Sequence, residues 1–321
     1  MKIGIAGLGS SGSFLINLLT KEGFDVTGFD PKMDGYYIPC GYATNLSRMK
    51  ELIAMCGLNF TDYILSKAEK VTFRNSKGKS FTFRSNGLCT FDKNRLERDL
   101  ISQTNWERRK LSGNFDLVVD ATGISRSYLP ITEDFTMKTI EYVSNTEESH
   151  DFEFNYFDHG TGYFWIFPIK GKYHIGAGSD SHERICRALS GYSRERIVSR
   201  NIRLKPLFDH SSYLNVIGIG ESIGTVSPIT GEGIVPSMKS AFLLLKALKA
   251  TDNVEEIKRL YHESLIKEFG YYNRLYDLLA KFRGGEVRIS SNMIRDAITA
   301  RKDIRGFGID FRLTKILRDL L

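Results

Sequence analysis

Glycines near the start of the chain form the first pattern with a chemical meaning. The sequence GLGSSG at residues 7–12 has GxGxxG spacing and lies between a short apolar segment and a segment with helical periodicity. Such glycines permit a tight turn, a close approach of the backbone to a pyrophosphate and close packing of helix on strand. An aspartate follows the next apolar segment, near the distance typical of an acid that binds an adenosine ribose. The residues predicted to bind a dinucleotide here are Gly7, Gly9, Ser10, Ser11, Gly12 and Asp30. The alternative is a tight turn without a nucleotide.

Two later segments favour a flavin dinucleotide over NAD. The first, DATG at residues 120–123, puts small residues at the end of an apolar strand, where ligands bind in open parallel sheets; a plain strand end is the alternative. The second, residues 218–234, carries an acid, a proline and glycines before a helix, whose N-terminus can stabilise a ring that becomes anionic on reduction. The predicted cofactor contacts are Ala121, Thr122, Gly123, Gly220, Glu221, Pro228, Gly231, Gly233 and Ile234.

These residues need a parallel sheet to position them, and the periodicity predicts one. We expect strands over 2–6, 25–29, 115–120 and 214–220, and helices over 13–21, 47–68, 93–103 and 233–249. Alternating patterns predict a hairpin over 71–75 and 80–84 and a mostly antiparallel sheet over 137–179. Helices with a break at Gly284 and Gly285 are expected after residue 251.

The predicted fold is therefore of the α/β class. It comprises a discontinuous Rossmann-type FAD-binding domain, an inserted antiparallel β-sheet substrate domain and C-terminal helices. The FAD-binding domain is assigned to residues 1–70, 85–130 and 214–250, the substrate domain to 71–84 and 131–213, and the helical region to 251–321.

Composition excludes several other classes of protein. Hydrophobic residues make up 41% and charged residues 26% of the 321 residues, as in folded globular proteins, and the apolar runs are too short to span a membrane. The four cysteines are far apart, which predicts a cytoplasmic protein without a structural metal. The net charge of +7 is spread along the chain and indicates a solvated surface or attraction to anionic headgroups at a membrane surface. No recognised motif indicates nucleic-acid binding.

In combination and order, the motifs resemble those of the archaeal geranylgeranyl reductase family, in the para-hydroxybenzoate hydroxylase superfamily. The matching segments are GLGSSG, Pro39-Cys40-Gly41, DATG, YFWIFP at residues 163–168 and GESIGTVSPITGEG at residues 220–233. The resemblance implies FAD as cofactor and the saturation of carbon–carbon double bonds in an isoprenoid. It also adds Lys93 to the cofactor contacts, at a position where the family has an arginine. Two departures are that Glu221 replaces an aspartate and that no second cysteine partner for Cys40 follows residue 250.

The resemblance also implies roles at the reacting end of the site. Cys40 is the candidate catalytic residue, a proton donor or redox partner beside the flavin; otherwise it is an inert buried thiol. Tyr163, Trp165 and Phe167 alternate along a strand and so share a face, which predicts either a substrate pocket or core packing. His174, in another alternating strand, is interpreted as a sheet-surface or core residue.

The resulting hypothesis is an FAD-dependent oxidoreductase acting on an isoprenoid lipid or another small apolar substrate. An aromatic monooxygenase with the same fold and a catalytically silent flavin- or lipid-binding homologue are the alternatives. No dedicated NAD(P) motif accompanies the FAD motifs, which suggests an electron-donor protein such as a ferredoxin. The sequence leaves the oligomeric state open.

Overall fold

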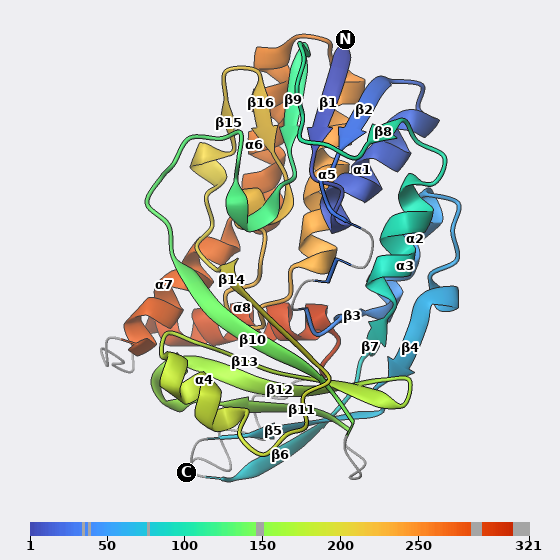
Figure 1. Cartoon of the computed structure of the whole chain (residues 1–321). Coiled ribbons are helices and arrows are strands. Elements are labelled where there is room, and N and C mark those ends of the chain that lie inside the picture. Colours follow the sequence, from blue (N-terminus) through green and yellow to red (C-terminus); the bar gives the residue numbers. More distant parts are fainter. Residues whose placement is uncertain (34–35, 38–39, 76–77, 146–150, 284–290, 311–321) are drawn as a thin grey trace.

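The GxGxxG turn follows a central strand of a six-stranded sheet (Figure 1). The computed structural model describes residues 1–33, 36–37, 40–75, 78–145, 151–283 and 291–310. The strands of this sheet, from one edge to the other, are β15 (Ser212–Tyr213), β16 (Val216–Gly218), β9 (Leu117–Asp120), β1 (Lys2–Ala6), β2 (Asp25–Phe29) and β8 (Trp106–Glu107). All neighbouring pairs are parallel except β15 with β16. The carboxyl ends of strands far apart in the sequence therefore lie along the same edge of the sheet.

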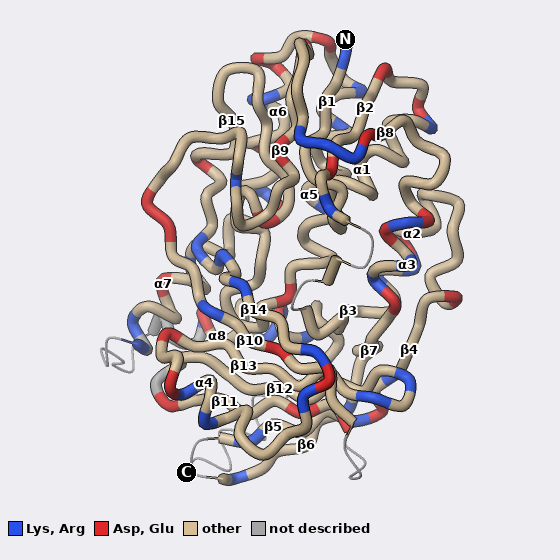
Figure 2. The backbone as a smooth tube through the Cα atoms, viewed as in Figure 1, with Lys and Arg blue, Asp and Glu red and all other residues tan. Residues whose placement is uncertain are grey.

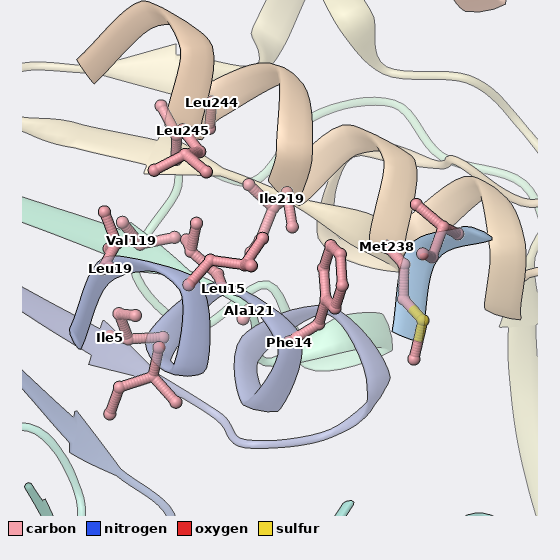
Figure 3. Close-up of a cluster of buried hydrophobic side chains, with 14 of the residues drawn as sticks. Ile5, Phe14, Leu15, Leu19, Val119, Ala121, Ile219, Met238, Leu244 and Leu245 are labelled. Atoms are coloured by element: carbon pink, nitrogen blue, oxygen red, sulfur yellow. The ribbon is translucent and has the colours of Figure 1, made fainter. Parts of the chain in front are cut away.

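Two helices cover one face of this sheet and form its core. Helix α1 (Ser10–Lys21) begins directly after the glycine turn, and α5 (Ile234–Ala250) packs against it. Their apolar side chains meet those of the central strands (Figure 3), because both helices and strands are apolar on the facing side. Labelled members of this core are Ile5, Phe14, Leu15, Leu19, Val119, Ala121, Ile219, Met238, Leu244 and Leu245.

The alternating segments form a second, seven-stranded sheet. Its strands in spatial order are β14 (Arg196–Arg203), β10 (Thr136–Ser144), β13 (Lys172–Ser179), β12 (Gly162–Ile169), β11 (Phe152–Tyr156), β5 (Lys70–Arg74) and β6 (Ser80–Arg84). The predicted hairpin, β5 with β6, joins this sheet through a parallel pairing in which Phe152 lies beside Val71. Helix α4 (His182–Ala188) lies against the sheet.

Smaller elements connect and cover the two sheets. A three-stranded sheet has the order β3 (Ala43–Asn45), β7 (Leu88–Phe91) and β4 (Ile64–Lys67). The remaining α-helices are α2 (Leu46–Met55), α3 (Lys93–Ile101), α6 (Val254–Phe269), α7 (Tyr271–Arg283) and α8 (Ser291–Phe307). The predicted break at Gly284 and Gly285 lies outside the described residues. Among the described residues, no helix is both long and apolar enough to cross a bilayer.

One predicted element is wrong in its second half. The expected helix over 47–68 ends at Met55, and Gly57 follows with a φ of 73°. A 3-10 turn (Phe60–Tyr63) then leads into β4, which pairs with β7. Short apolar segments fit a strand as well as a helix, and pairing with β7, a strand distant in the sequence, decided between them.

Basic and acidic side chains are mixed over the whole molecule. Figure 2 shows Lys and Arg interspersed with Asp and Glu on both sheets and on the helices. The surplus of +7 is therefore spread over many elements rather than confined to a single segment.

The glycine turn gives a first prediction about stability. A Cβ on Gly12 would overlap the carbonyl oxygen of Gly7, a backbone atom that cannot move without distorting the turn. We expect Gly12→Ala to lower the free energy of unfolding by about 3 kcal/mol, as overpacking of a tight contact does. Gly9→Ala is the matched control, because its Cβ would lie 3.7 Å from the nearest atom, Lys32 Nζ. Urea unfolding without added ligand measures both, and equal stability of the two variants would contradict the prediction.

Candidate functional site

A cavity of about 1010 Å³ lies at the carboxyl ends of the parallel strands. One wall comes from the turns after β1, β2 and β9 and from the residues that open α1 and α5. The opposite wall comes from β10, β12 and β14 of the seven-stranded sheet. Ligands of open parallel sheets bind at this edge. The volume lies at the upper end of the range for sites that bind small molecules.

Most residues predicted from the sequence line this cavity. Those that do are Gly7, Gly9, Ser10, Ser11, Asp30, Cys40, Lys93, Ala121, Thr122, Gly123, Tyr163, Trp165, Phe167, Glu221, Gly231, Gly233 and Ile234. Gly12, Gly220 and Pro228 are not part of the lining. The two glycines instead permit close packing: at Gly220, where φ is 67°, a Cβ would lie 2.6 Å from the Ser11 hydroxyl oxygen.

The glycine turn is fixed to the end of β2 by a carboxylate. Asp30 Oδ2 accepts a hydrogen bond from the amide of Leu8 at 2.7 Å, and Oδ1 accepts one from the amide of Lys32 at 3.0 Å. Gly9 is the N-cap of α1 and makes no side-chain capping bond. The first amides of the helix therefore have no side-chain cap and open onto the cavity, as an anion site requires.

The predicted basic contact, Lys93, is buried and carries a partner. Its ammonium group lies 2.5 Å from Glu97 Oε1, and the same oxygen accepts a hydrogen bond from the Ser10 hydroxyl at 3.0 Å. This chain connects α3 to the beginning of α1. The charge of Lys93 is thus partly neutralised before any ligand binds.

A buried arginine connects the two sheets. The Arg203 guanidinium donates to the carbonyl oxygens of Gly123 (3.2 Å), Ile124 (2.9 Å) and Glu221 (2.7 Å), and to Asp134 Oδ2 (2.9 Å). The amide of Arg203 also donates to Glu221 Oε1 at 3.0 Å.

The second carboxylate oxygen of Glu221 forms an ion pair with Arg200. Glu221 is therefore tied to β14 through both of its carboxylate oxygens.

The aromatic triplet packs in a hydrophobic cluster and also lines the cavity. Trp165 and Phe167 are buried in a cluster between the sheet and α8, and they also line the cavity with Tyr163. The Tyr163 hydroxyl donates to the carbonyl oxygen of Thr230 at 2.7 Å, which ties β12 to the loop before α5. Contact with a substrate stays a prediction.

The candidate thiol lies in the cavity wall with its backbone held at both ends. The ring of His174 binds the Cys40 carbonyl oxygen through Nδ1 at 3.0 Å, and Glu141 Oε1 accepts from the Cys40 amide at 3.4 Å. Burial raises the pKa of the thiol above its usual value, and the nearby Lys93 partly opposes this rise. Cys40 is therefore protonated at neutral pH.

Three functional candidates were missed by the sequence reasoning: Glu141, His174 and Tyr37. Glu141 and His174 are almost completely buried, so His174 is the core residue that was one of the two predictions, and it has polar partners there. The available signal was an acid in the middle of an otherwise apolar strand segment, TIEYV. Within the described part of the chain, no group of three or more His, Cys, Asp or Glu side chains could hold a metal ion.

Comparison with known sequences connects the chain to a reductase. No family model matches it. It is 22% identical to uncharacterized protein MJ1182 of Methanocaldococcus jannaschii over 99% of this chain and 95% of that protein. It is 30% identical to the digeranylgeranylglycerophospholipid reductase of Sulfolobus acidocaldarius over 165 residues, which are 41% of this chain and 36% of that reductase.

Solved structures share the whole architecture. A geranylgeranyl bacteriochlorophyll reductase-like protein of Thermoplasma acidophilum matches with a TM-score of 0.75 at 13% identity, over 93% of this chain and 90% of that one. PqsL of Pseudomonas aeruginosa, a probable FAD-dependent monooxygenase, matches with a TM-score of 0.68 at 15% identity, over 88% of this chain and 96% of that one. The fold is that of FAD-dependent oxidoreductases. The resemblance to the geranylgeranyl reductase family and the predicted fold class are confirmed.

Two carboxyl groups meet at the loop before α5: the half-buried Glu232 belongs to the loop, and the buried Asp303 contacts it from α8. Asp303 of α8 accepts hydrogen bonds from the hydroxyls of Ser227 (2.5 Å) and Tyr271 (3.3 Å), and Glu232 Oε1 accepts from the amide of Val235 (2.9 Å). Burial raises the pKa of Asp303 to about 6 and that of Glu232 to about 7. Helix α8 thus contacts the loop before α5 through the Asp303 carboxyl group, whose pKa is raised.

The raised pKa of Asp303 gives a prediction about pH. The folded state holds this proton more tightly than the unfolded state, so protonated Asp303 adds to the free energy of unfolding. This contribution is complete below about pH 4 and is lost as the pH rises to about 6. A shift of this size corresponds to about 3 kcal/mol. The stability of the wild type should therefore fall between pH 4.5 and pH 7, and we expect Asp303→Asn to abolish the part of this fall that Asp303 causes. Urea unfolding midpoints at the two pH values measure it. Asp209→Asn, at an exposed acid, is the control; identical pH dependence in wild type and Asp303→Asn would refute the assignment.

Proposed function

We propose that the protein binds FAD and reduces carbon–carbon double bonds of an isoprenoid or a similar apolar molecule. The observation that carries the proposal is the convergence in one cavity of the glycine turn, the DATG strand end, the loop before α5, the Cys40 thiol and an aromatic wall. The likeness to a digeranylgeranylglycerophospholipid reductase supports the substrate class.

The cavity lining fits the parts of FAD. The uncapped first turn of α1 suits the pyrophosphate, and Gly9 leaves room because a Cβ there would meet no atom within 3.7 Å. Asp30, whose carboxylate oxygens keep acceptor capacity beside their two amide partners, suits the adenosine ribose. Gly123 and the residues that open α5 suit the ring system. FAD, when bound, supplies the hydride chemistry that the protein lacks.

The chain itself supplies the apolar surroundings and the proton. Trp165 and Phe167 offer an apolar wall that excludes water from a substrate. An isolated double bond needs a proton at one carbon as well as a hydride at the other, and a positioned acid accelerates such transfers. We assign that acid to Cys40, because its raised pKa keeps the proton on the sulfur.

The cofactor assignment is tested by the absorption spectrum of the purified protein and chromatography of the released cofactor. We expect FAD, and we expect Asp30→Ala to weaken FAD binding about 10- to 100-fold, since it removes a charged hydrogen-bond acceptor. Asp25→Ala, at the exposed beginning of the same strand, is the matched control. A colourless protein that refuses added FAD and binds NAD would overturn the proposal.

The reaction is tested with reduced enzyme and a geranylgeranyl lipid under anaerobic conditions. We expect Cys40→Ala to lower the rate of saturation by about 100-fold or more with FAD content unchanged, because positioned proton donors contribute that much. Cys186→Ala, at the exposed cysteine, is the control.

Two other outcomes would redirect the assignment. Oxygen-dependent turnover of an aromatic substrate would favour the monooxygenase alternative, which the likeness to PqsL brings with it. Full activity of Cys40→Ala would remove the thiol from the mechanism. We propose that a donor protein such as a ferredoxin supplies the electrons that reduce the flavin. Fast reduction of the flavin by NADPH alone would contradict this proposal.

A further inference from the structure

Three polar side chains contact one another and the backbone of Cys40. Glu141 comes from β10, His174 from β13 and Tyr37 from the segment after β2. The Tyr37 hydroxyl lies 2.6 Å from His174 Nε2 and 3.3 Å from Glu141 Oε1. His174 and Glu141 also contact the carbonyl and the amide of Cys40, as described above. These side chains therefore hydrogen-bond to both the carbonyl and the amide of Cys40.

The chemistry of the partners fixes the direction of these hydrogen bonds. A carbonyl oxygen only accepts, so His174 donates to Cys40 from Nδ1 and its Nε2 is an acceptor. Tyr37 therefore donates its proton to Nε2, and the same hydroxyl also lies 3.3 Å from the carboxylate oxygen Oε1 of Glu141. Burial lowers the pKa of His174 to about 4 and raises that of Glu141 to about 8, which keeps both groups neutral at pH 7.

A glycine makes room for this buried acid. In the register of the sheet, Gly176 of β13 lies between Glu141 of β10 and Trp165 of β12. A Cβ on Gly176 would overlap the indole ring, which therefore lies across β13. The indole N–H approaches the Glu141 carboxyl group closely enough to lower its pKa, without the geometry of a full hydrogen bond. The acid is thus enclosed by the same aromatic residue that lines the cavity.

The charges around the thiol come from several elements. Lys93 of α3 and Arg200 of β14 lower the pKa of Cys40, whereas Glu141 of β10 raises it. The hydroxyl groups of Tyr37 and Tyr42 also face this site, and burial raises the pKa of both well above neutrality. Once ionised, above about pH 8, Glu141 is the negative group that raises the pKa of the thiol. Its ionisation opposes the loss of the proton from Cys40.

We propose that Glu141, Tyr37 and His174 form a buried relay that fixes the Cys40 backbone and keeps its thiol protonated in the cavity. The three are positioning residues, since they act through Cys40 rather than on a substrate. Their importance for catalysis rests on the proposed function. Their effect on the thiol does not, because it requires no flavin.

The test measures how fast iodoacetamide alkylates Cys40 as a function of pH. The background is full-length Cys186→Ala, since Cys56 and Cys89 are buried and burial raises the pKa of each to about 12. We expect Glu141→Gln to shift the midpoint of the profile to lower pH by about one unit or more, because a nearby negative charge is removed. Glu183→Gln, at an exposed acid of α4, is the matched control. A purely structural role would change the rate equally at all pH values without moving the midpoint.

A second variant covers the case in which Glu141→Gln does not fold. His174→Gln removes the imidazole that holds the Cys40 carbonyl, and we expect alkylation at pH 7.5 to become about 10-fold faster as the segment loosens. An unmoved midpoint in folded Glu141→Gln would overturn the proposal, as would an unchanged rate in His174→Gln if Glu141→Gln does not fold.

Activity separates this proposal from the proposed function. If the protein reduces isoprenoids, Glu141→Gln should lower kcat with little change in KM. If it binds no FAD, the proposed function fails while the alkylation profile still decides the role of the relay.

Discussion

The Arg203 guanidinium holds together the junction on which the cavity depends. It is almost fully buried and donates to backbone carbonyls after β9 and β16 and to the carboxylate of Asp134. A buried cation is costly unless it is paired and hydrogen-bonded, and here four acceptors from three segments bind the guanidinium. The seven-stranded sheet is thereby fixed against the carboxyl edge of the parallel sheet. The Arg200–Glu221 ion pair and the Tyr163–Thr230 hydrogen bond reinforce the same junction, which makes the glycine turn and the aromatic wall face each other.

The cavity is polar at one end and apolar at the other, and burial sets the protonation of its groups. Around the glycine turn, charged residues such as Asp30 and Lys93 are paired with amides or with an opposite charge. Around Cys40, the same low-dielectric surroundings keep the thiol, Glu141 and His174 neutral. Such a site can hold a proton and an apolar molecule at the end near Cys40, and a phosphate at the opposite end, near the glycine turn.

The fold alone does not choose a reaction. Reductase-like and monooxygenase proteins match this chain with similar TM-scores, 0.75 and 0.68, so the architecture accommodates both chemistries. The distinction depends on the few side chains around the reacting end of the cavity. Cys40 and the polar groups behind it are the part of the site that argues for protonation of a double bond rather than for activation of oxygen.

Local sequence determined the parts of the protein whose pattern is complete within a short segment. The glycine turn, β1, β2, the β5–β6 hairpin and most of α5 follow from periodicity and spacing, because each needs only its own residues or its immediate neighbours. Tertiary structure decided the rest. Residues 64–67 became a strand because β7 offered a partner, and tertiary structure chose the distant β11 as the strand of the second sheet with which the hairpin pairs. Glu141, His174 and Tyr37 meet only because three segments more than 30 residues apart in the sequence converge behind Cys40. Their burial and pKa values are consequences of that convergence, which no local pattern contains.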